Sequence, residues 1–262
     1  MRKTDFLENS YVNGFIEWLE PLMDKPNSFY HSYTTSKKKK YCEFTNLYDA
    51  LKEYDYKLDI KFENYAYNLR QAVDNDNNET CVKVCYEIIE WGGVKRNLKH
   101  IDCRASYLSL YLRDVRDRLY KDLPLKEYNQ ESIYMSSGFS KIYSAFIDDF
   151  IIYDSRVSAS LGLFIRLFLE ESNITYIPKQ LEFRLAPGRT NNLRNPEKGR
   201  YIFKGITMRN YLEYNIKANW LLAGIADRTK SKFATIERNL RPREIERALF
   251  QVGYDLTDFR YK

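Results

Sequence analysis

The segment that most constrains the fold is SRVSASLGLFIRLFLEE, residues 155–171. It is strongly apolar and has the length of an ordinary globular helix, while a bilayer span needs roughly 18 consecutive apolar residues. Asp154 stands directly before it, where a carboxylate can accept hydrogen bonds from the first-turn amides as an N-cap. We therefore predict a helix over residues 155–171 that lies in the core with other elements packed around it.

Most of the remaining chain also has apolar residues at helical spacing. Pro21 and Pro26 are predicted to end the first helix, and Thr45 is predicted to cap the second. Gly92 and Gly93 should stop a helix that begins near Asn78. The predicted helices cover residues 5–23, 45–56, 78–94, 104–120, 210–226, 232–240 and 242–255, the fourth with a buried stripe of Leu108, Leu112, Val115 and Leu119 and the last with Pro242 in its first turn.

These helices predict a mostly α fold with two helical lobes that meet at a cleft. The lobes are expected to comprise residues 1–125 and residues 126–262. A few short strands are expected near Tyr30 and Glu182. No stretch is long and apolar enough to span a bilayer, and the first ten residues lack the apolar centre of a secretory signal, so we expect a cytoplasmic protein without a membrane partner.

The cysteines favour packing over metal binding. Cys81 and Cys85 lie four residues apart and would share one face of a helix, which is typical of small buried residues. No C-x-x-C pair is present, and only His31 and His100 could complete a site. We therefore predict no zinc site, no iron–sulfur cluster and no other cofactor.

Positive charge is concentrated in one segment. The 262-residue chain has 42 Lys and Arg against 36 Asp and Glu, a net charge of +6, and 23 tyrosines. Cations neutralise phosphates and rings stack on bases, so this composition favours a nucleic-acid partner. Residues 178–205 hold nearly all of the excess, with Lys179, Arg184, Arg189, Arg194, Lys198, Arg200 and Lys204 against Glu182 and Glu197.

The stretch from Ser136 to Val157 carries the candidate chemistry. Residues 136–141 are predicted to form a turn that feeds a helix starting near Ser140, where free backbone amides could hold a DNA phosphate. Lys141 would lie in the first turn of that helix. Asp154 follows at the start of the next predicted helix, so the amine and the carboxylate could face each other across a cleft.

These residues resemble the helix-hairpin-helix DNA glycosylase superfamily. The resemblance rests on Gly138-x-x-Lys141 and on Ile152-Tyr153-Asp154 before a helix, and it extends weakly to residues 91–93, 217–222 and 248–254. Closest are prokaryotic proteins with an 8-oxoguanine glycosylase fold, some of which act against phage DNA that carries modified bases. The resemblance implies a helix-hairpin-helix-like element and removal of a modified base from double-stranded DNA by a monomer.

The resemblance also implies roles for individual residues. Lys141 would attack the sugar carbon that bears the base, and Asp154 would stabilise positive charge on the sugar. An everted base needs a lined pocket, although core packing is the alternative for each ring. The candidate pocket residues are Trp91, Tyr143, Tyr153, Asn219 and Trp220. The candidate DNA contacts are Ser137, Gly138, Ser140, Arg156, Arg184, Arg189, Arg194 and Arg200.

Several alternatives stay open at this point. Asp154 could activate water without help from Lys141, and the substrate could be 8-oxoguanine, with or without strand cleavage by a lyase step. Asp55-Tyr56-Lys57 and Asp59-Ile60-Lys61 echo the acid-x-lysine pattern of metal-dependent nucleases. A non-catalytic DNA-binding module that uses only the basic segment is a further possibility.

Overall fold

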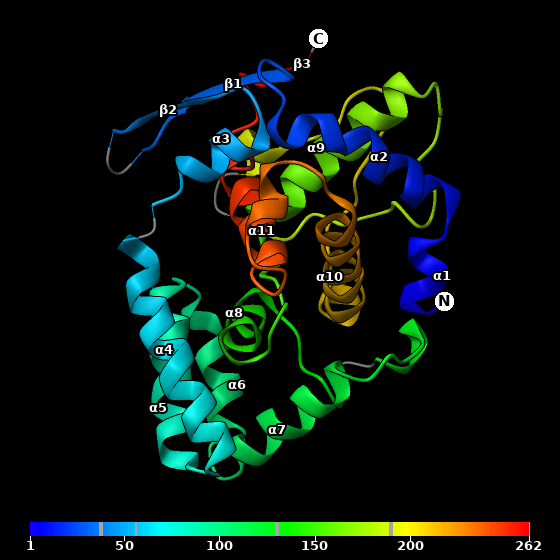
Figure 1. Cartoon of the computed structure of the whole chain (residues 1–262). Coiled ribbons are helices and arrows are strands. Elements are labelled where there is room, and N and C mark those ends of the chain that lie inside the picture. Colours follow the sequence, from blue (N-terminus) through cyan, green and yellow to red (C-terminus); the bar gives the residue numbers. More distant parts are fainter. Residues whose placement is uncertain (37–38, 56, 129–130, 189–190, 262) are drawn as a thin grey trace.

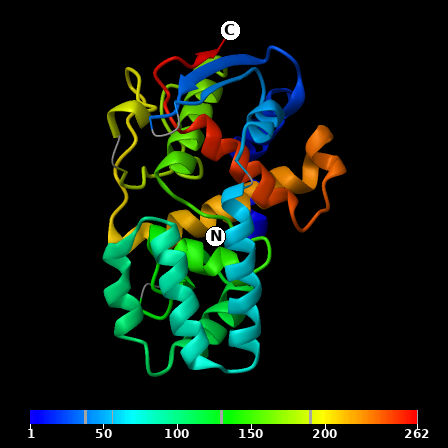
Figure 2. The same ribbon diagram turned by 90° about the vertical axis from the view of Figure 1, so that its left-hand side faces the viewer.

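The computed structural model describes residues 1–36, 39–55, 57–128, 131–188 and 191–261, without the side chains of residues 57–59 and 191. The chain is mostly helical with a small sheet, in agreement with the predicted fold class. Its helices form two groups, which occupy the upper and lower parts of the molecule in Figures 1 and 2.

The lower group consists of consecutive helices. The helices α4, α5 and α8 pack against one another, and α7 packs on α4 and α5. Buried residues of α5 include Cys81 and Cys85, which are unoxidised and share the core-facing side as predicted. The members are α4 (Lys57–Asp74), α5 (Asn78–Trp91), α6 (Leu98–Asp102), α7 (Leu108–Leu119) and α8 (Ser137–Phe146).

The upper group joins the two ends of the chain. Helix α3 packs on α11, and α2 packs on α9, while α10 lies against α1, α2 and α11. Helices from before residue 125 therefore pack against helices from after it. The division of the chain into two lobes at residue 125 stays a prediction. The members are α1 (Lys3–Leu7), α2 (Ser10–Asp24), α3 (Leu47–Lys52), α9 (Ser155–Glu171), α10 (Tyr211–Arg228) and α11 (Arg241–Val252).

A three-stranded antiparallel sheet covers the upper end of the molecule (Figure 1). Its strands are β1 (Phe29–Thr34), β2 (Tyr41–Phe44) and β3 (Arg260–Tyr261), in the order β2-β1-β3. His31 pairs with Phe44, and Phe29 pairs with Tyr261. The strand predicted near Tyr30 is confirmed. Near Glu182 the described residues form only an isolated bridge, between Leu185 and Gly205, so a strand there was wrongly predicted.

Helix α9 has the predicted bounds, Ser155–Glu171, and Asp154 is its N-cap. The Asp154 carboxylate accepts hydrogen bonds from the amides of Arg156 at 2.9 Å and Val157 at 3.3 Å. Most of the helix is buried between α2 and α11, as its apolar sequence requires.

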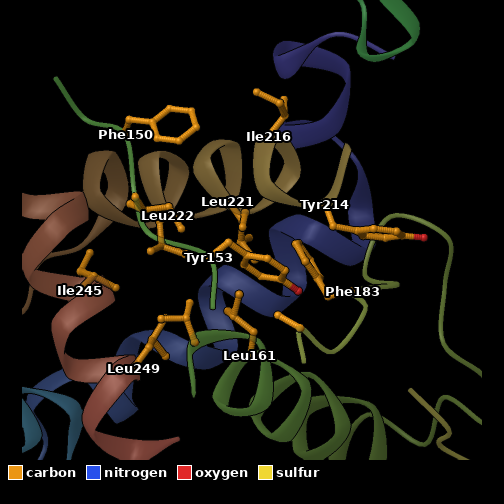
Figure 3. Packing of buried hydrophobic residues seen from close by; sticks show 14 of the residues in the cluster. Phe150, Tyr153, Leu161, Phe183, Tyr214, Ile216, Leu221, Leu222, Ile245 and Leu249 are labelled. Carbon is orange, nitrogen blue, oxygen red and sulfur yellow. The ribbon is translucent and has the colours of Figure 1, made fainter. Parts of the chain in front are cut away.

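The extended segment between α8 and α9 lies in the core of the upper group. Its amides at Ile151 and Ile152 donate to Asn219 of α10 and to Glu246 of α11, at 2.8 and 3.2 Å. The carbonyl of Tyr153 accepts a hydrogen bond from Tyr211 at 2.7 Å. Figure 3 shows Tyr153 among Leu161, Phe183, Leu221 and Leu249. Side chains from three helices therefore fix the segment that leads to Asp154.

Several predicted boundaries were wrong by a turn or less. Pro21 lies inside α2, because a proline in the last turn breaks only one intrahelical hydrogen bond, and the helix ends just before Lys25 and Pro26. Asn46 rather than Thr45 caps α3, since its side chain accepts from the Asp49 amide. Residues 232–240 contain only a short 3-10 turn, Lys232–Thr235, instead of an α-helix.

Candidate active site

Helix α8 begins earlier than its glycine suggests. Ser136 is the N-cap, and its Oγ accepts a hydrogen bond from the Phe139 amide at 3.2 Å and donates to Asn97 at 2.6 Å. Gly138 is helical and closely packed, because a Cβ there would lie 2.7 Å from the Asn97 side chain. The glycine is therefore needed for helix packing and does not form a turn before the helix.

The predicted hairpin is absent from the described residues. Helix α7 ends at Leu119 and α8 begins only at Ser137, with one 3-10 turn, Leu125–Glu127, between them. The Ser140 amide donates to the Ser136 carbonyl at 2.8 Å, and Ser140 is fully buried. The expected phosphate site at the Ser140 amide is therefore wrong, since that donor is already used inside the helix.

Lys141 and Asp154 are brought together as predicted. Lys141 Nζ lies 3.8 Å from Asp154 Oδ2, and only 9% and 15% of the two side chains are exposed. The ammonium also donates to the Ser137 carbonyl at 3.1 Å. The pair thus joins the second turn of α8 to the N-cap of α9, and Lys141 was wrongly predicted in the first turn of its helix, because α8 begins at Ser137.

The surroundings of Lys141 make it a weaker base than an exposed lysine. Burial lowers the pKa of Lys141, Asp154 opposes this shift, and the cations Arg243 and Arg156 add to the lowering. The side chain runs past Gly92, where a Cβ would lie 2.6 Å from Lys141 Cδ. Gly92, which ends α5, therefore leaves room for the lysine, a role that sequence reasoning did not assign to it.

The predicted pocket tyrosines are core residues. Tyr143 and Tyr153 are both 0% exposed, so neither presents a ring face on which a base could stack. The Tyr143 hydroxyl donates to the Tyr134 carbonyl at 2.8 Å, and the Tyr153 hydroxyl donates to the Arg184 carbonyl at 2.7 Å. Their spacing on apolar faces reflects packing, and their assignment to a base pocket is corrected here.

The other predicted pocket residues are spread over the molecule. Asn219 binds the Ile151 amide and holds the segment before Asp154. Trp220 is 7% exposed and lies against Phe6 and Tyr128 in the upper group. Trp91 is half-buried and packs 4.7 Å from the Phe62 ring in the lower group. Trp91 and Trp220 therefore pack in different groups of helices.

Arg156 and Arg194 form a second cationic group beside the pair. The Arg156 guanidinium lies over the rings of Phe250 and Tyr254, at 4.2 and 4.6 Å from their centroids. Arg194 donates to Ser155 Oγ at 2.8 Å and to the Tyr254 carbonyl at 3.2 Å. Within the described part of the chain, neither arginine has a carboxylate oxygen within 4.0 Å. These two predicted DNA contacts therefore lie together at the start of α9.

The remaining predicted DNA contacts differ in exposure. Arg184 turns inward to the Tyr214 hydroxyl at 3.1 Å, whereas Arg200 is exposed. Ser137 is partly buried and its carbonyl accepts the Lys141 hydrogen bond. Arg189 lies outside the described residues, as do Tyr56 and the side chains of residues 57–59 in the nuclease-like triplets.

A cavity of about 340 Å³ adjoins Ser155, the residue after Asp154. The segment from Leu185 to Ile206 forms the rest of its wall, and Arg194 is among the lining residues. A larger hollow of about 610 Å³ lies elsewhere, beside Trp18, Leu167 and Tyr261, and contains none of the predicted site residues. Neither cavity is lined by Lys141 itself.

Lys217 is a buried cation that sequence reasoning left without a role. Its Nζ donates to the carbonyls of Lys179 at 3.1 Å and Glu182 at 2.8 Å. It also lies over the rings of Phe183 and Tyr214, at 5.0 and 5.2 Å. Burial lowers the pKa of Lys217 to about 8. In the sequence, the signal for a buried cation was a lysine within the apolar run of α10.

Comparisons with known proteins leave the family open. No family model, no curated protein and no solved structure matches the chain. In the described ranges, no group of three or more His, Cys, Asp and Glu side chains could hold a metal ion. None of the described helices combines the length and apolar character that a bilayer crossing requires.

Proposed function

We propose that this protein is a DNA glycosylase that removes a modified base from double-stranded DNA and leaves an abasic site. The observation that supports this proposal best is the ion pair of Lys141 and Asp154, which are largely buried and 3.8 Å apart. A buried group with a shifted pKa beside a specific charged partner, as Lys141 is here, is a candidate for a functional site. The sequence resemblance assigns the same two residues to base excision.

The chemistry of the pair suits cleavage of the bond between sugar and base. When this bond breaks, the base leaves with the bonding electrons and positive charge develops on C1′ and the ring oxygen. The Asp154 carboxylate would stabilise that charge. A water molecule that loses a proton, or the neutral amine of Lys141, would then form the new bond to C1′. In the amine route the nitrogen gives one proton to the departing base, and the C1′–O4′ bond then breaks with its electrons going to O4′, which takes up a proton. A protonated imine between Lys141 and the opened sugar remains. In the water route one proton of the water goes to the departing base, and only the base is released.

The surrounding charges suit a DNA substrate. Lys141, Arg156 and Arg194 are grouped around Asp154, whereas Arg243 pairs with Glu246, and no carboxylate oxygen of the described residues lies within 4.0 Å of Arg156 or Arg194. Phosphodiesters would neutralise this excess. We further propose that the protein acts as a monomer in the cytoplasm, and that its substrate is a hypermodified cytosine of phage DNA, with 8-oxoguanine as the alternative.

Base release from defined DNA tests the proposal. Wild-type protein is incubated with duplexes that contain glucosylated 5-hydroxymethylcytosine, 8-oxoguanine or only ordinary bases, and abasic sites are counted with an aldehyde-reactive probe. Asp154→Asn is the test variant, because asparagine keeps the N-cap hydrogen bonds and removes the charge. We expect base release to fall by at least about a hundredfold while DNA binding survives.

Controls separate the remaining possibilities. Arg209→Gln changes an exposed charge outside the predicted site residues and should release the base at the wild-type rate. Borohydride trapping of a covalent complex in the wild type, and its loss in Lys141→Gln, would identify the amine route. Equal base release by Asp154→Asn and wild type would contradict the proposal. Binding without any base release would favour a non-catalytic DNA-binding module.

A further inference from the structure

The cavity beside Ser155 has the size and the mixed lining of a small-ligand site. Its volume of about 340 Å³ lies near the lower end of the range of roughly 300–1,000 Å³ that is usual for such pockets. Leu185, Phe203 and Ile206 give it apolar walls, and Arg194 and Asn195 add polar groups. Tyr143 and Tyr153 are buried in the core and present no ring face to a base. The cavity beside Ser155, which follows Asp154 in the sequence, is the candidate in their place.

Two strand-like segments form one wall of the cavity. The Leu185 amide donates to the Lys204 carbonyl at 3.0 Å, and the Ile206 amide donates to the Leu185 carbonyl at 2.9 Å. The pairing is a parallel bridge between Leu185 and Gly205. Figure 2 shows this region in yellow along one side of the upper group. The wall is therefore held by backbone hydrogen bonds from both of its segments.

Buried polar side chains fix the same wall from behind. Ser158 Oγ of α9 accepts a hydrogen bond from the Ala186 amide at 2.9 Å, and Tyr153 donates to the Arg184 carbonyl at 2.7 Å. Lys217 of α10 donates to the Glu182 carbonyl at 2.8 Å. These three side chains are at most 3% exposed. Burial of such groups is unfavourable unless each is hydrogen-bonded. The three hydrogen bonds therefore hold the backbone of the cavity wall in a fixed position before any ligand binds.

The polar side of the cavity offers both donors and acceptors. Arg194 is oriented by Ser155 and by the Tyr254 carbonyl, which leaves further N–H donors of its guanidinium without a protein acceptor among the described residues. The carboxylate oxygens of Glu197 accept from the Phe203 amide at 2.9 Å and from the Asn195 side chain at 3.3 Å, and each keeps a further lone pair for a ligand. A ligand that presents both donors and acceptors along one edge matches this lining better than a phosphate, which Glu197 would repel.

We propose that this cavity is the recognition pocket for the nucleobase, with Leu185, Phe203 and Ile206 against the ring and Arg194, Asn195 and Glu197 at its hydrogen-bonding edge. The inference rests on the proposed function for the origin of the base in DNA. It assigns base recognition to the 185–206 segment and leaves the chemistry to Lys141 and Asp154. In this proposal the protein distinguishes a modified base from an ordinary one by the contacts that each base makes with this segment.

Nucleoside binding followed by NMR tests the pocket without any catalytic step. Protein labelled at the methyl groups of alanine, isoleucine and leucine is titrated with 2′-deoxycytidine, 5-hydroxymethyl-2′-deoxycytidine and 8-oxo-2′-deoxyguanosine. We expect saturable shifts of the Leu185, Ala186 and Ile206 methyl signals with a modified nucleoside. Arg194→Gln should weaken this binding by about tenfold or more, because a charged donor to the ligand is lost.

Matched variants keep the test decisive. Arg209→Gln makes the same charge change at an exposed position just after this segment and should bind like the wild type. Asn195→Ala changes an exposed lining residue and serves if Arg194→Gln does not fold. No saturable shift with any of the three nucleosides at millimolar concentration, shifts at other methyl groups, or equal binding by Arg194→Gln, Asn195→Ala and wild type would overturn the inference.

Duplex DNA separates the failure of this inference from the failure of the proposed function. Nucleoside binding at the pocket without abasic sites in any duplex would reject the glycosylase and leave the pocket as a nucleoside site. Abasic sites formed by Arg194→Gln and Asn195→Ala with wild-type rate and base preference would reject the pocket and leave the glycosylase.

Discussion

Two lysines are buried among the residues that the structure describes, and their partners differ. Lys141, at the junction of α8 and α9, has a carboxylate 3.8 Å away and one carbonyl acceptor. Lys217, in α10, has two carbonyl acceptors and two ring faces, and no described carboxylate lies within 4.0 Å of its Nζ. Burial lowers the pKa of both. A lowered lysine pKa alone therefore does not mark a nucleophile, and the type of partner separates a structural cation from a candidate catalytic one.

The largest expected effect is on stability and comes from Lys217→Met. The carbonyls of Lys179 and Glu182 lose their donor, so we expect the free energy of unfolding to fall by about 2–3 kcal/mol. Urea denaturation followed by circular dichroism measures the change. Lys141→Met is the matched variant and should cost only about 1 kcal/mol, because Asp154 keeps its two amide donors. Equal losses of unfolding free energy in the two variants would contradict the distinction between the two lysines.

The second expected effect is a dependence of stability on pH that requires Lys217. Its pKa is about 8 in the folded protein and about 10.4 in an unfolded chain. Between these values the unfolded state binds more protons, so stability should rise with pH from about 8 to 9.5, by up to about 1.4 kcal/mol per pH unit. Below pH 8 this lysine is protonated in both states and adds no slope.

Lys217→Met should remove this rise, and the difference between the two proteins isolates it from other groups. Burial raises the pKa of Tyr143 and Tyr153, so the unfolded state loses tyrosine protons first and stability should fall again above about pH 10. Denaturant midpoints measured at several pH values check the profile. The same rise in wild type and variant would show that Lys217 is not its source.

The smallest expected effect concerns the space around Lys141. Gly92→Ala would place a Cβ 2.6 Å from Lys141 Cδ, so the flexible lysine must shift. We expect a stability loss of about 0.5–1 kcal/mol and, under the proposed function, slower base release without weaker DNA binding. Gly205→Ala is the control for stability alone, because a Cβ there meets nothing within 4 Å. Wild-type base release by Gly92→Ala would show that the position of the lysine is not critical.

Local sequence signals predicted the elements around the site well. The bounds of α9, the Asp154 cap and the stop of α5 at Gly92 follow from neighbouring residues in the chain, and the structure confirms all three. The contact of Lys141 with Asp154 also agrees with the prediction. In these cases a short stretch of sequence holds the information, because caps and apolar faces are local features.

Other features depend on distant residues and could not be predicted in this way. A tyrosine on an apolar face looks the same in sequence whether it lines a cavity or fills a core, and only the packing of α9, α10 and α11 shows that Tyr153 fills the core. Gly138 resembled a hairpin glycine, yet its closest neighbour is Asn97, far away in the chain. The cavity beside Ser155 needs the segment from Leu185 to Ile206, whose bridge also joins residues that are not neighbours in sequence.

The extended segment between α8 and α9 also has a consequence for the order of assembly. Lys141 and Asp154 are synthesised within a few residues of each other, but Asn219, Tyr211 and Glu246, which hold the backbone between them, follow much later in the chain. A nascent chain that has not yet reached α11 has both charged groups but not all of the side chains that set their separation. The geometry of the candidate site is therefore complete only after α11 has been synthesised.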